Sequence, residues 1–257
     1  MRAYSGTELS GELVIPETYY GRPVVEISAN GFEDGAYYSG RVNTKGITKV
    51  VLPKTIVKIG DFAFYGVTNL AEVDLSACVD AENFGGKSLF RKCSKLATVK
   101  LPMGGKLKII NAGMFSRSEE LTEITLPYSV NEIDYSAFEG DSKLAVVKQY
   151  NEYNSLNYNW LAVNRIGHHA FQDCNLTSMT CYYRDNGNGG GNNYYNNPNL
   201  VIENNAFYGN ENMTSYVYNG PSGGIIGDWA FYGTALTTFR PAGHNQVGYR
   251  SIPNTLS

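Results

Sequence analysis

The sequence is poor in histidine, in net charge and in long apolar runs. It has three histidines in 257 residues, a formal net charge of −3 and an isoelectric point near 5.7. A protein that holds nucleic acid needs a basic surface, which this balance does not supply. No run approaches the roughly 18 apolar residues of a membrane-spanning helix. Met1–Tyr4 lack an apolar signal region, so we expect any export signal or anchor to lie outside this chain.

A degenerate repeat runs through most of the chain, and LTEITLPYSVNEIDYSAFEG (Leu121–Gly140) is a clear copy. Each copy centres on a phenylalanine, here called the anchor. An isoleucine lies five residues before the anchor, except in one copy that has Gly85. In seven of the eight copies a leucine or methionine follows five or six residues after the anchor, with another large apolar residue three further on. The first copy continues into Ile47 and Val50 after an insertion. The anchors are Phe32, Phe64, Phe90, Phe115, Phe138, Phe171, Phe207 and Phe231.

The repeat is too short to fold alone. Its period is 23 to 26 residues where no insertion intervenes. One coil buries about four or five apolar side chains, each contributing roughly 1.5–3 kcal/mol. Ordering about 24 residues costs on the order of 1–2 kcal/mol for each residue. Only stacking against neighbouring coils makes folding favourable, so we predict one solenoid domain over residues 1–257 with about eight coils.

Within a coil, the segment around Ile124 predicts a short strand. Leu121, Ile124 and Leu126 point inward, whereas Glu123 and Thr125 alternate outward. Proline then ends the strand because it has no N–H to donate. Stacked copies would form a parallel sheet along one face. The returning segment VNEIDYSAF is too short for a regular α-helix, which predicts a strand-like or 3-10 return on the other face.

The order TLPYSVNEIDYSAFEGDSKL resembles the BspA-like leucine-rich repeat, known from bacterial surface proteins such as that of Treponema pallidum and from some protozoan parasites. The resemblance extends from about Leu13 to Pro241. It implies a leucine-rich-repeat solenoid, a right-handed superhelix with a parallel β-sheet on the concave face and short strand or 3-10 returns on the convex face. It also implies cell-surface display, adhesion and binding of host or partner-cell proteins.

Three insertions interrupt the repeat, near residues 33–46, 148–163 and 182–199. The second and third are rich in aromatic residues and lie in successive repeats, so we expect them to be neighbours in space. Tyrosine and tryptophan are good interface anchors. The predicted ligand-binding residues are Tyr150, Tyr153, Tyr158, Trp160, Tyr182, Tyr183, Tyr194 and Tyr195. Alternatively, these rings bind no ligand and instead cover their own loops and the flanks of the coils. The outward face of the concave sheet is a second candidate binding surface.

Other chemistry finds little support in the sequence. His168 and His169 are adjacent in an extended stretch, where their side chains diverge, so we predict no metal site there. Asp185–Asn193 lacks the spacing of a calcium loop. His244 lies in a tail expected to be irregular, with no recognisable nucleophile motif. Cys93 and Cys174 share one slot of the repeat and Cys181 takes an inward strand position, which favours free buried thiols over disulfides.

The sequence therefore predicts a non-catalytic interaction module, displayed on the cell surface or secreted. A host matrix or cell-surface protein is the expected partner, and no cofactor, metal or nucleic acid is expected. The alternative is a glycan-binding module that uses the Tyr/Trp-rich insertions as stacking platforms.

Overall fold

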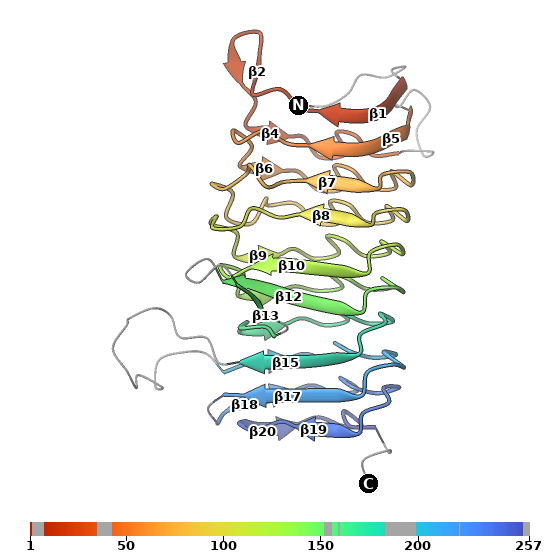
Figure 1. Cartoon of the computed structure of the whole chain (residues 1–257), viewed down its shortest axis with the longest axis vertical. Helices are drawn as coiled ribbons and strands as arrows, with labels where there is room; N and C mark the ends of the chain where they lie inside the picture. The colour runs from red at the N-terminus through yellow and green to blue at the C-terminus, as the bar shows by residue number, and fades with distance from the viewer. Residues whose placement is uncertain are drawn as a thin grey trace, which may run out of the picture.

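The structure, a computed structural model, describes residues 1, 8–34, 43–151, 156–158, 160–182, 199–220 and 222–253. Coils stack along one long axis, and each coil crosses from one face of the stack to the other (Figure 1). Across these ranges the chain forms strands and turns without a helix. The predicted leucine-rich-repeat solenoid is confirmed, and the returns are short strands rather than 3-10 turns.

The longer strands form one side of the stack, which we call the long-strand face. They pair in parallel as β1-β5-β7-β8, then β10-β12 and then β15-β17-β19. These strands are β1 (Glu8–Val14), β5 (Asn43–Val51), β7 (Glu72–Asp74), β8 (Thr98–Lys100), β10 (Glu123–Pro127), β12 (Val146–Asn151), β15 (Ser178–Tyr182), β17 (Ser215–Asn219) and β19 (Thr238–Arg240).

The returning segments form the opposite side, the short-strand face. Six of them make one parallel sheet in the order β20-β18-β16-β14-β11-β9, and β4 pairs with β6. Gly85, the one departure from the isoleucine column, still bridges to Ile59. These strands are β4 (Glu26–Ile27), β6 (Lys58–Ile59), β9 (Ile109–Ile110), β11 (Glu132–Ile133), β14 (Arg165–Ile166), β16 (Val201–Ile202), β18 (Gly224–Ile226) and β20 (His244–Val247).

Two further pieces stand apart from this pattern. β2 (Thr18–Tyr19) and β3 (Arg22–Pro23) form a hairpin near the N-terminus. β13 (Leu156–Tyr158) pairs antiparallel with β12, so part of the second insertion, expected as a loop, extends the sheet instead. Residues 156–158 show no alternation of polar and apolar side chains from which this strand could be predicted.

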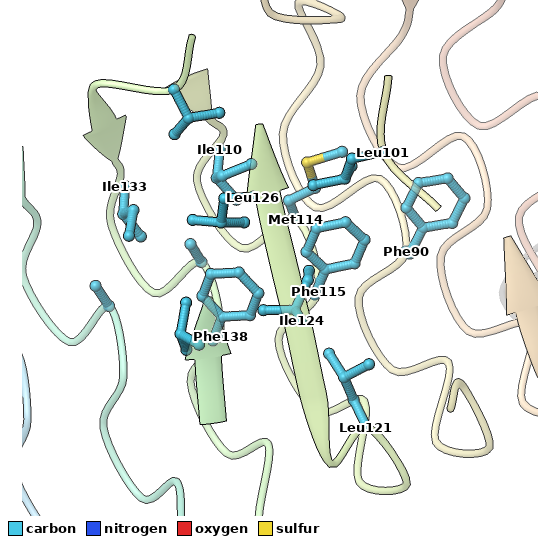
Figure 2. Close-up of a cluster of buried hydrophobic side chains, with 14 of the residues drawn as sticks. Phe90, Leu101, Ile110, Met114, Phe115, Leu121, Ile124, Leu126, Ile133 and Phe138 are labelled. Carbon is cyan, nitrogen blue, oxygen red and sulfur yellow. The ribbon is translucent and has the colours of Figure 1, made fainter. Parts of the chain in front are cut away.

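The core is a column of stacked rings between the two faces. All eight anchor phenylalanines are buried. Each ring stacks on the next, with centroids 5.0 to 5.9 Å apart. Figure 2 shows Phe90, Phe115 and Phe138 within this column, with Ile124 and Leu126 beside them. Because every ring contacts the coil above and the coil below, the repeat retains an aromatic at this position.

Each coil turns from its short strand to its anchor through a left-handed residue. The second residue before the anchor has φ between 52° and 60° in all eight coils. Its N–H then reaches the next coil, as in the bond from Trp229 N to Tyr249 O at 2.9 Å. This conformation costs an L-residue roughly 1–2 kcal/mol, and Phe62 and Trp229 adopt it with bulky side chains. We call this position the left-handed slot.

The tail after Pro241 is not irregular, contrary to the prediction. β20 pairs with β18, Gly248 N donates to Ile226 O, and Phe231 N donates to Ser251 O. These bonds repeat the pattern between earlier coils. Residues 244–252 therefore form the first half of a further coil, in which Arg250 takes the left-handed slot with φ 48°.

Candidate functional site

The second and third insertions leave the stack where long strands end, on the edge that we call the strand-end edge (Figure 1). The second follows β12 and the third follows β15. The first insertion instead follows anchor Phe32, so it belongs to the opposite edge. β12 and β15, the strands that lead into these two insertions, therefore end at the same edge of successive coils. The proximity of the insertions themselves stays a prediction.

A buried glutamine holds the second insertion in place. The Gln149 side-chain amide donates to Pro127 O at 3.3 Å and to Val130 O at 3.1 Å, and its Oε1 accepts from Ala162 N at 2.7 Å. Leu161 N then donates to Thr180 O at 2.9 Å. The insertion is thus fixed to the coils on both sides. The sequence did not reveal this role of Gln149, because a polar residue is expected anywhere in a loop.

The described aromatic residues of the predicted site lie along this edge. The rings of Trp160 and Tyr182 are in contact, with centroids 5.1 Å apart and planes tilted by 55°. Tyr182 is 40% exposed, while Trp160 and Tyr150 are half-buried. Tyr158 contributes its backbone to β13. Four predicted residues lie outside the described ranges: Tyr153, Tyr183, Tyr194 and Tyr195.

The N-terminal part of the long-strand face is a ladder of ion pairs. Lys49 lies 3.2 Å from Glu12 and 3.7 Å from Glu72, and Lys100 lies 2.7 Å from Glu72 and 3.5 Å from Asp74. Such exposed pairs contribute about 0–1 kcal/mol each. Because the charges alternate across adjacent strands, they neutralise one another and leave little net field for a partner.

The C-terminal part of this face is almost uncharged. Parallel pairing aligns one outward row of small hydroxyl side chains and a second, mixed row. The rows are Ser178, Ser215, Thr238 and Thr180, Val217, Arg240. Serine and threonine side chains are short, so a contact over these rows orders little side-chain entropy.

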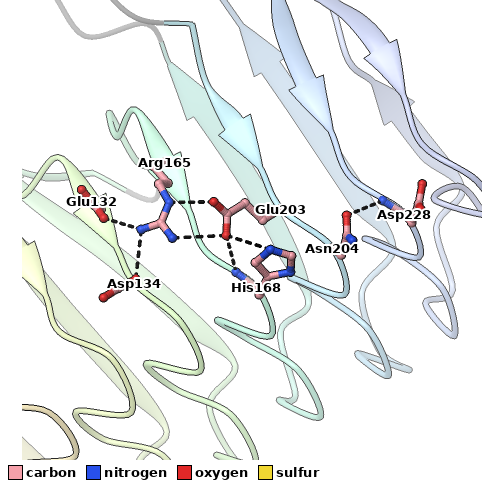
Figure 3. Close-up of polar contacts among 7 residues, drawn as sticks. All are labelled: Glu132, Asp134, Arg165, His168, Glu203, Asn204 and Asp228. Carbon is pink, nitrogen blue, oxygen red and sulfur yellow. Dashed lines mark hydrogen bonds and ion pairs between the residues drawn. The ribbon is translucent and has the colours of Figure 1, made fainter.

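On the short-strand face, Arg165 joins carboxylates from the coil before its own and the coil after it (Figure 3). It pairs with Glu132, with Asp134 at 3.0 Å and with Glu203 at 2.8 Å. Hydrogen bonding to Glu203 raises the pKa of Arg165 further above its ordinary value. Partial burial raises the pKa of Glu203, but hydrogen bonds from Arg165 and from the backbone of His168 outweigh it, so that pKa lies below its ordinary value.

The two adjacent histidines make separate contacts on this face. His168 N donates to Glu203 Oε2 at 2.9 Å, whereas the ring of His169 contacts Gln172 and lies edge-on to Tyr135. No group of three or more metal-ligating side chains converges among the described residues. The calcium-loop candidate, 185–193, lies outside the described ranges. His244 is half-buried, with Nε2 2.9 Å from the Tyr216 hydroxyl and its ring packed on Tyr218.

All four cysteines are free and buried, as predicted. Burial raises the pKa of the Cys78 and Cys181 thiols to about 12. The Cys93 thiol donates to Phe64 O at 3.3 Å, and the Cys174 thiol donates to Phe138 O at 3.1 Å. These thiols bond one coil to the preceding one and are protonated at neutral pH, so they are poor nucleophiles.

A second aromatic group, absent from the sequence predictions, lies on the edge opposite the strand-end edge, where short strands lead into anchors. We call it the anchor-edge cluster: Tyr208, Trp229, Tyr232, Tyr249 and Arg250. Tyr208 stacks on Tyr232 at 5.5 Å, and Trp229 meets Tyr232 edge-on at 4.8 Å. The Arg250 guanidinium lies 5.2 Å from the Trp229 ring and 5.3 Å from the Tyr249 ring. The sequence signal for this cluster was an aromatic residue, Trp229, two residues before an anchor. It was missed because its partner Tyr249 lies in the tail that was predicted to be irregular.

A cavity of about 700 Å³ opens at the N-terminal end of the stack. Apolar side chains such as Leu9, Leu13, Val24 and Phe32 line it, together with Arg22. Residues 2–7, which lead from Met1 to β1, lie outside the described ranges, so we assign this cavity no ligand.

Several solved structures of bacterial proteins resemble this chain at low sequence identity. A leucine-rich repeat protein of T. pallidum is 21% identical, with 86% of this chain and 75% of that chain covered and a TM-score of 0.47. A leucine-rich cell surface protein of Faecalibacterium prausnitzii is 18% identical, with 96% and 82% covered and a TM-score of 0.32. The pneumococcal vaccine antigen PcpA is 18% identical, with 100% and 64% covered and a TM-score of 0.49.

The family comparison is more direct. None of the curated proteins compared with the chain matches it. The model of the BspA type leucine rich repeat region matches six copies, at residues 42–162 and 150–252. Repeats of this kind generally form non-catalytic interaction modules. Among the described residues, none lies in a helix long and apolar enough for a membrane crossing. From the repeats it carries, we conclude that the chain belongs to the family of BspA-type leucine-rich repeat proteins.

Proposed function

We propose that this chain is a single, non-catalytic module that is displayed on the cell surface or secreted and binds a protein of a host matrix or of another cell. Its binding surface comprises the strand-end edge and the adjoining C-terminal part of the long-strand face. The predicted residues Tyr150, Trp160 and Tyr182 belong to it, together with the five predicted tyrosines for which no side-chain position is described.

The observation that carries this proposal is the Trp160–Tyr182 ring pair beside the hydroxyl row and the mixed row of the C-terminal long strands. The two rings come from different coils. Leu161, the neighbour of Trp160, exchanges backbone hydrogen bonds with Thr180 and Tyr182 of β15, so the two rings are held at the same strand end. A rigid aromatic pair beside a flat hydroxyl surface can be covered by a partner without ordering a loop first, which lowers the entropy cost of association. Aromatic anchors at the rim of such a surface are typical hot spots.

A glycan ligand is the second candidate, because the same two rings could stack on sugar faces. The two ligands predict different footprints. A protein partner of standard size covers about 800 Å² of the module and therefore reaches the hydroxyl rows as well as the rings. A short glycan would depend on the rings alone.

The test compares two double variants for binding to purified extracellular-matrix proteins and to polysaccharides. Trp160→Ala with Tyr182→Ala removes the rings, and Thr180→Arg with Val217→Arg places bulky charges on the mixed row, next to the hydroxyl row. Glu211→Gln, an exposed change elsewhere, is the control. We expect a matrix protein to bind the parent chain and to lose at least about tenfold in affinity, or roughly 1.4 kcal/mol, in each double variant.

Loss in the ring variant alone, with a polysaccharide as the bound ligand, would support the glycan alternative. Full binding of a protein by both double variants would refute the proposed surface. Circular dichroism and urea unfolding of each variant establish that the fold is intact, so that lost binding can be assigned to the surface.

A further inference from the structure

We propose that the anchor-edge cluster is a separate binding site for an acidic saccharide, that is, a sugar chain whose pyranose rings carry carboxylates. It lies on the edge where short strands lead into anchors, whereas the Trp160–Tyr182 pair lies on the edge where long strands end. The inference is independent of the proposed protein-binding surface.

The first argument is backbone strain. Trp229 and Arg250 occupy the left-handed slot of consecutive coils, with φ of 59° and 48°. The same slot holds Asn30, Ser88 and Gly113 in other coils, residue types that fit this conformation or leave the surface bare. Phe62 and His169 also occupy this slot, so positive φ alone does not distinguish Trp229. What distinguishes Trp229 and Arg250 is that they fill the slot in consecutive coils, where their side chains contact each other.

The second argument is exposure combined with fixed geometry. Tyr249 is 63% exposed and Tyr232 is 38% exposed. Trp229 N donates to Tyr249 O at 2.9 Å, and Tyr249 N donates to Asp228 Oδ1 at 2.7 Å. The backbone that carries the exposed rings is therefore held on both sides, and the rings face solvent without a loop that must first become ordered.

The third argument concerns charge. Arg250 makes no ion pair within the described residues, and its guanidinium lies over two aromatic rings. Asp228 is the nearest acid in sequence, but its Oδ1 already accepts from the backbone of Tyr249. A guanidinium held this way keeps donors for a planar anion such as a carboxylate.

Together, these groups select the ligand class. The exposed rings of Tyr232 and Tyr249 and the half-buried ring of Trp229 offer apolar faces on which the C–H face of a sugar can stack. A neutral sugar offers the Arg250 cation no anionic partner. An acidic peptide offers an anion but lacks a sugar ring that could stack on the aromatic side chains. An acidic saccharide satisfies both the rings and Arg250.

The experiment uses the two tryptophans of the chain as reporters, since one lies at each edge. In Trp160→Phe the indole of Trp229 is the only one, and in Trp229→Phe that of Trp160 is the only one. Fluorescence is followed while an oligogalacturonate is added, with a neutral maltooligosaccharide and a poly-glutamate of similar length as comparison ligands.

We expect a saturable change in the Trp229 reporter with oligogalacturonate, and a response at least about tenfold weaker with either comparison ligand. Arg250→Gln and Tyr249→Ala, each made in the Trp160→Phe background, should each weaken binding about tenfold. The matched controls are Phe62→Asn and Lys92→Gln, which alter an exposed aromatic and a cation on the same edge of other coils. They should leave the affinity unchanged.

No saturable change with oligogalacturonate would overturn the inference. Equal binding of the neutral sugar or of poly-glutamate would overturn it too, as would unchanged affinity in both Arg250→Gln and Tyr249→Ala. A response confined to the Trp160 reporter would place glycan binding at the strand-end edge instead, which contradicts this inference while leaving the other surface open to its own test.

Discussion

Replacing Asp141 by asparagine should stabilise the protein. Asp141 lies three residues after anchor Phe138 and is fully buried. Its Oδ1 accepts from Ser118 N at 2.8 Å, but its Oδ2 has no hydrogen-bond partner among the described residues. Asn210 fills the same slot two coils later, where its side-chain NH₂ donates to two backbone carbonyls at 2.7 and 3.0 Å. An asparagine at position 141 can therefore bond as Asn210 does.

The magnitude has a constant part and a part that depends on pH. A buried polar atom without a partner costs about 1–3 kcal/mol, which the amide should largely recover. Burial also raises the pKa of Asp141 well above its ordinary value. Above an unfolded-state pKa of about 3.9 the unfolded chain releases a proton that the folded chain retains, so the wild-type protein loses up to about 1.36 kcal/mol per pH unit. The asparagine variant has no such loss.

The assay is urea unfolding of wild type and Asp141→Asn at pH 4, 5, 6 and 7. The variant's advantage should widen by up to about 2.7 kcal/mol between pH 4 and pH 6. Burial lowers the pKa of His244 to about 4, so that residue adds stability as pH rises towards 6.5. Both proteins contain His244, so its effect cancels in the difference. Glu211→Gln, which removes an exposed carboxyl, should show no widening. A constant difference, or a variant less stable than wild type at pH 7, would refute the reasoning.

Three further changes test other parts of the argument. Arg117→Gly should stabilise by about 1 kcal/mol in urea unfolding, because Arg117 is exposed at φ 64°. Lys95→Gly, at an exposed residue without positive φ, should instead destabilise. Phe115→Ala should cost about 3–5 kcal/mol because it opens a gap in the ring column, and a loss below 1 kcal/mol would contradict continuous stacking. Arg165→Gln should destabilise at pH 7 but much less below pH 4, because the lowered pKa of Glu203 contributes stability only while that carboxylate is ionised.

The buried columns could be predicted from sequence because each of their positions meets the same neighbours in every coil. Phe115 contacts Phe90 and Phe138, so one residue type satisfies all three coils, and the spacing of the anchors reveals the stack. The free thiols of Cys93 and Cys174 were predicted for the same reason. A shared slot next to an anchor is buried whichever residue fills it, and burial keeps a thiol protonated.

The remaining features depend on contacts that have no fixed spacing in the sequence. Arg165 joins residues that precede and follow it by more than 30 positions, because insertions separate these coils in the chain but not in space. The Gln149 side chain holds the second insertion through three hydrogen bonds, two to the preceding coil and one to Ala162. A polar residue in a segment expected to be a loop gives no sign of such bonds. Most of the predicted strand-end tyrosines lie outside the described residues, so that part of the site stays a prediction.

The two tryptophans illustrate two physical routes by which a stacked repeat can gain a binding surface. Trp160 belongs to an insertion whose ends return to fixed positions, so its length can change without disturbing the stack. Trp229 belongs to a slot whose spacing cannot change, because its N–H bonds the next coil. There only the side chain can vary, and an aromatic in that slot carries a conformational cost of roughly 1–2 kcal/mol. The ring contacts with Tyr232 and the cation of Arg250 offset part of that cost. The side chains of the anchor-edge cluster therefore stabilise one another. Removing Arg250 should make the Trp229 side chain more mobile, in addition to removing a positive charge.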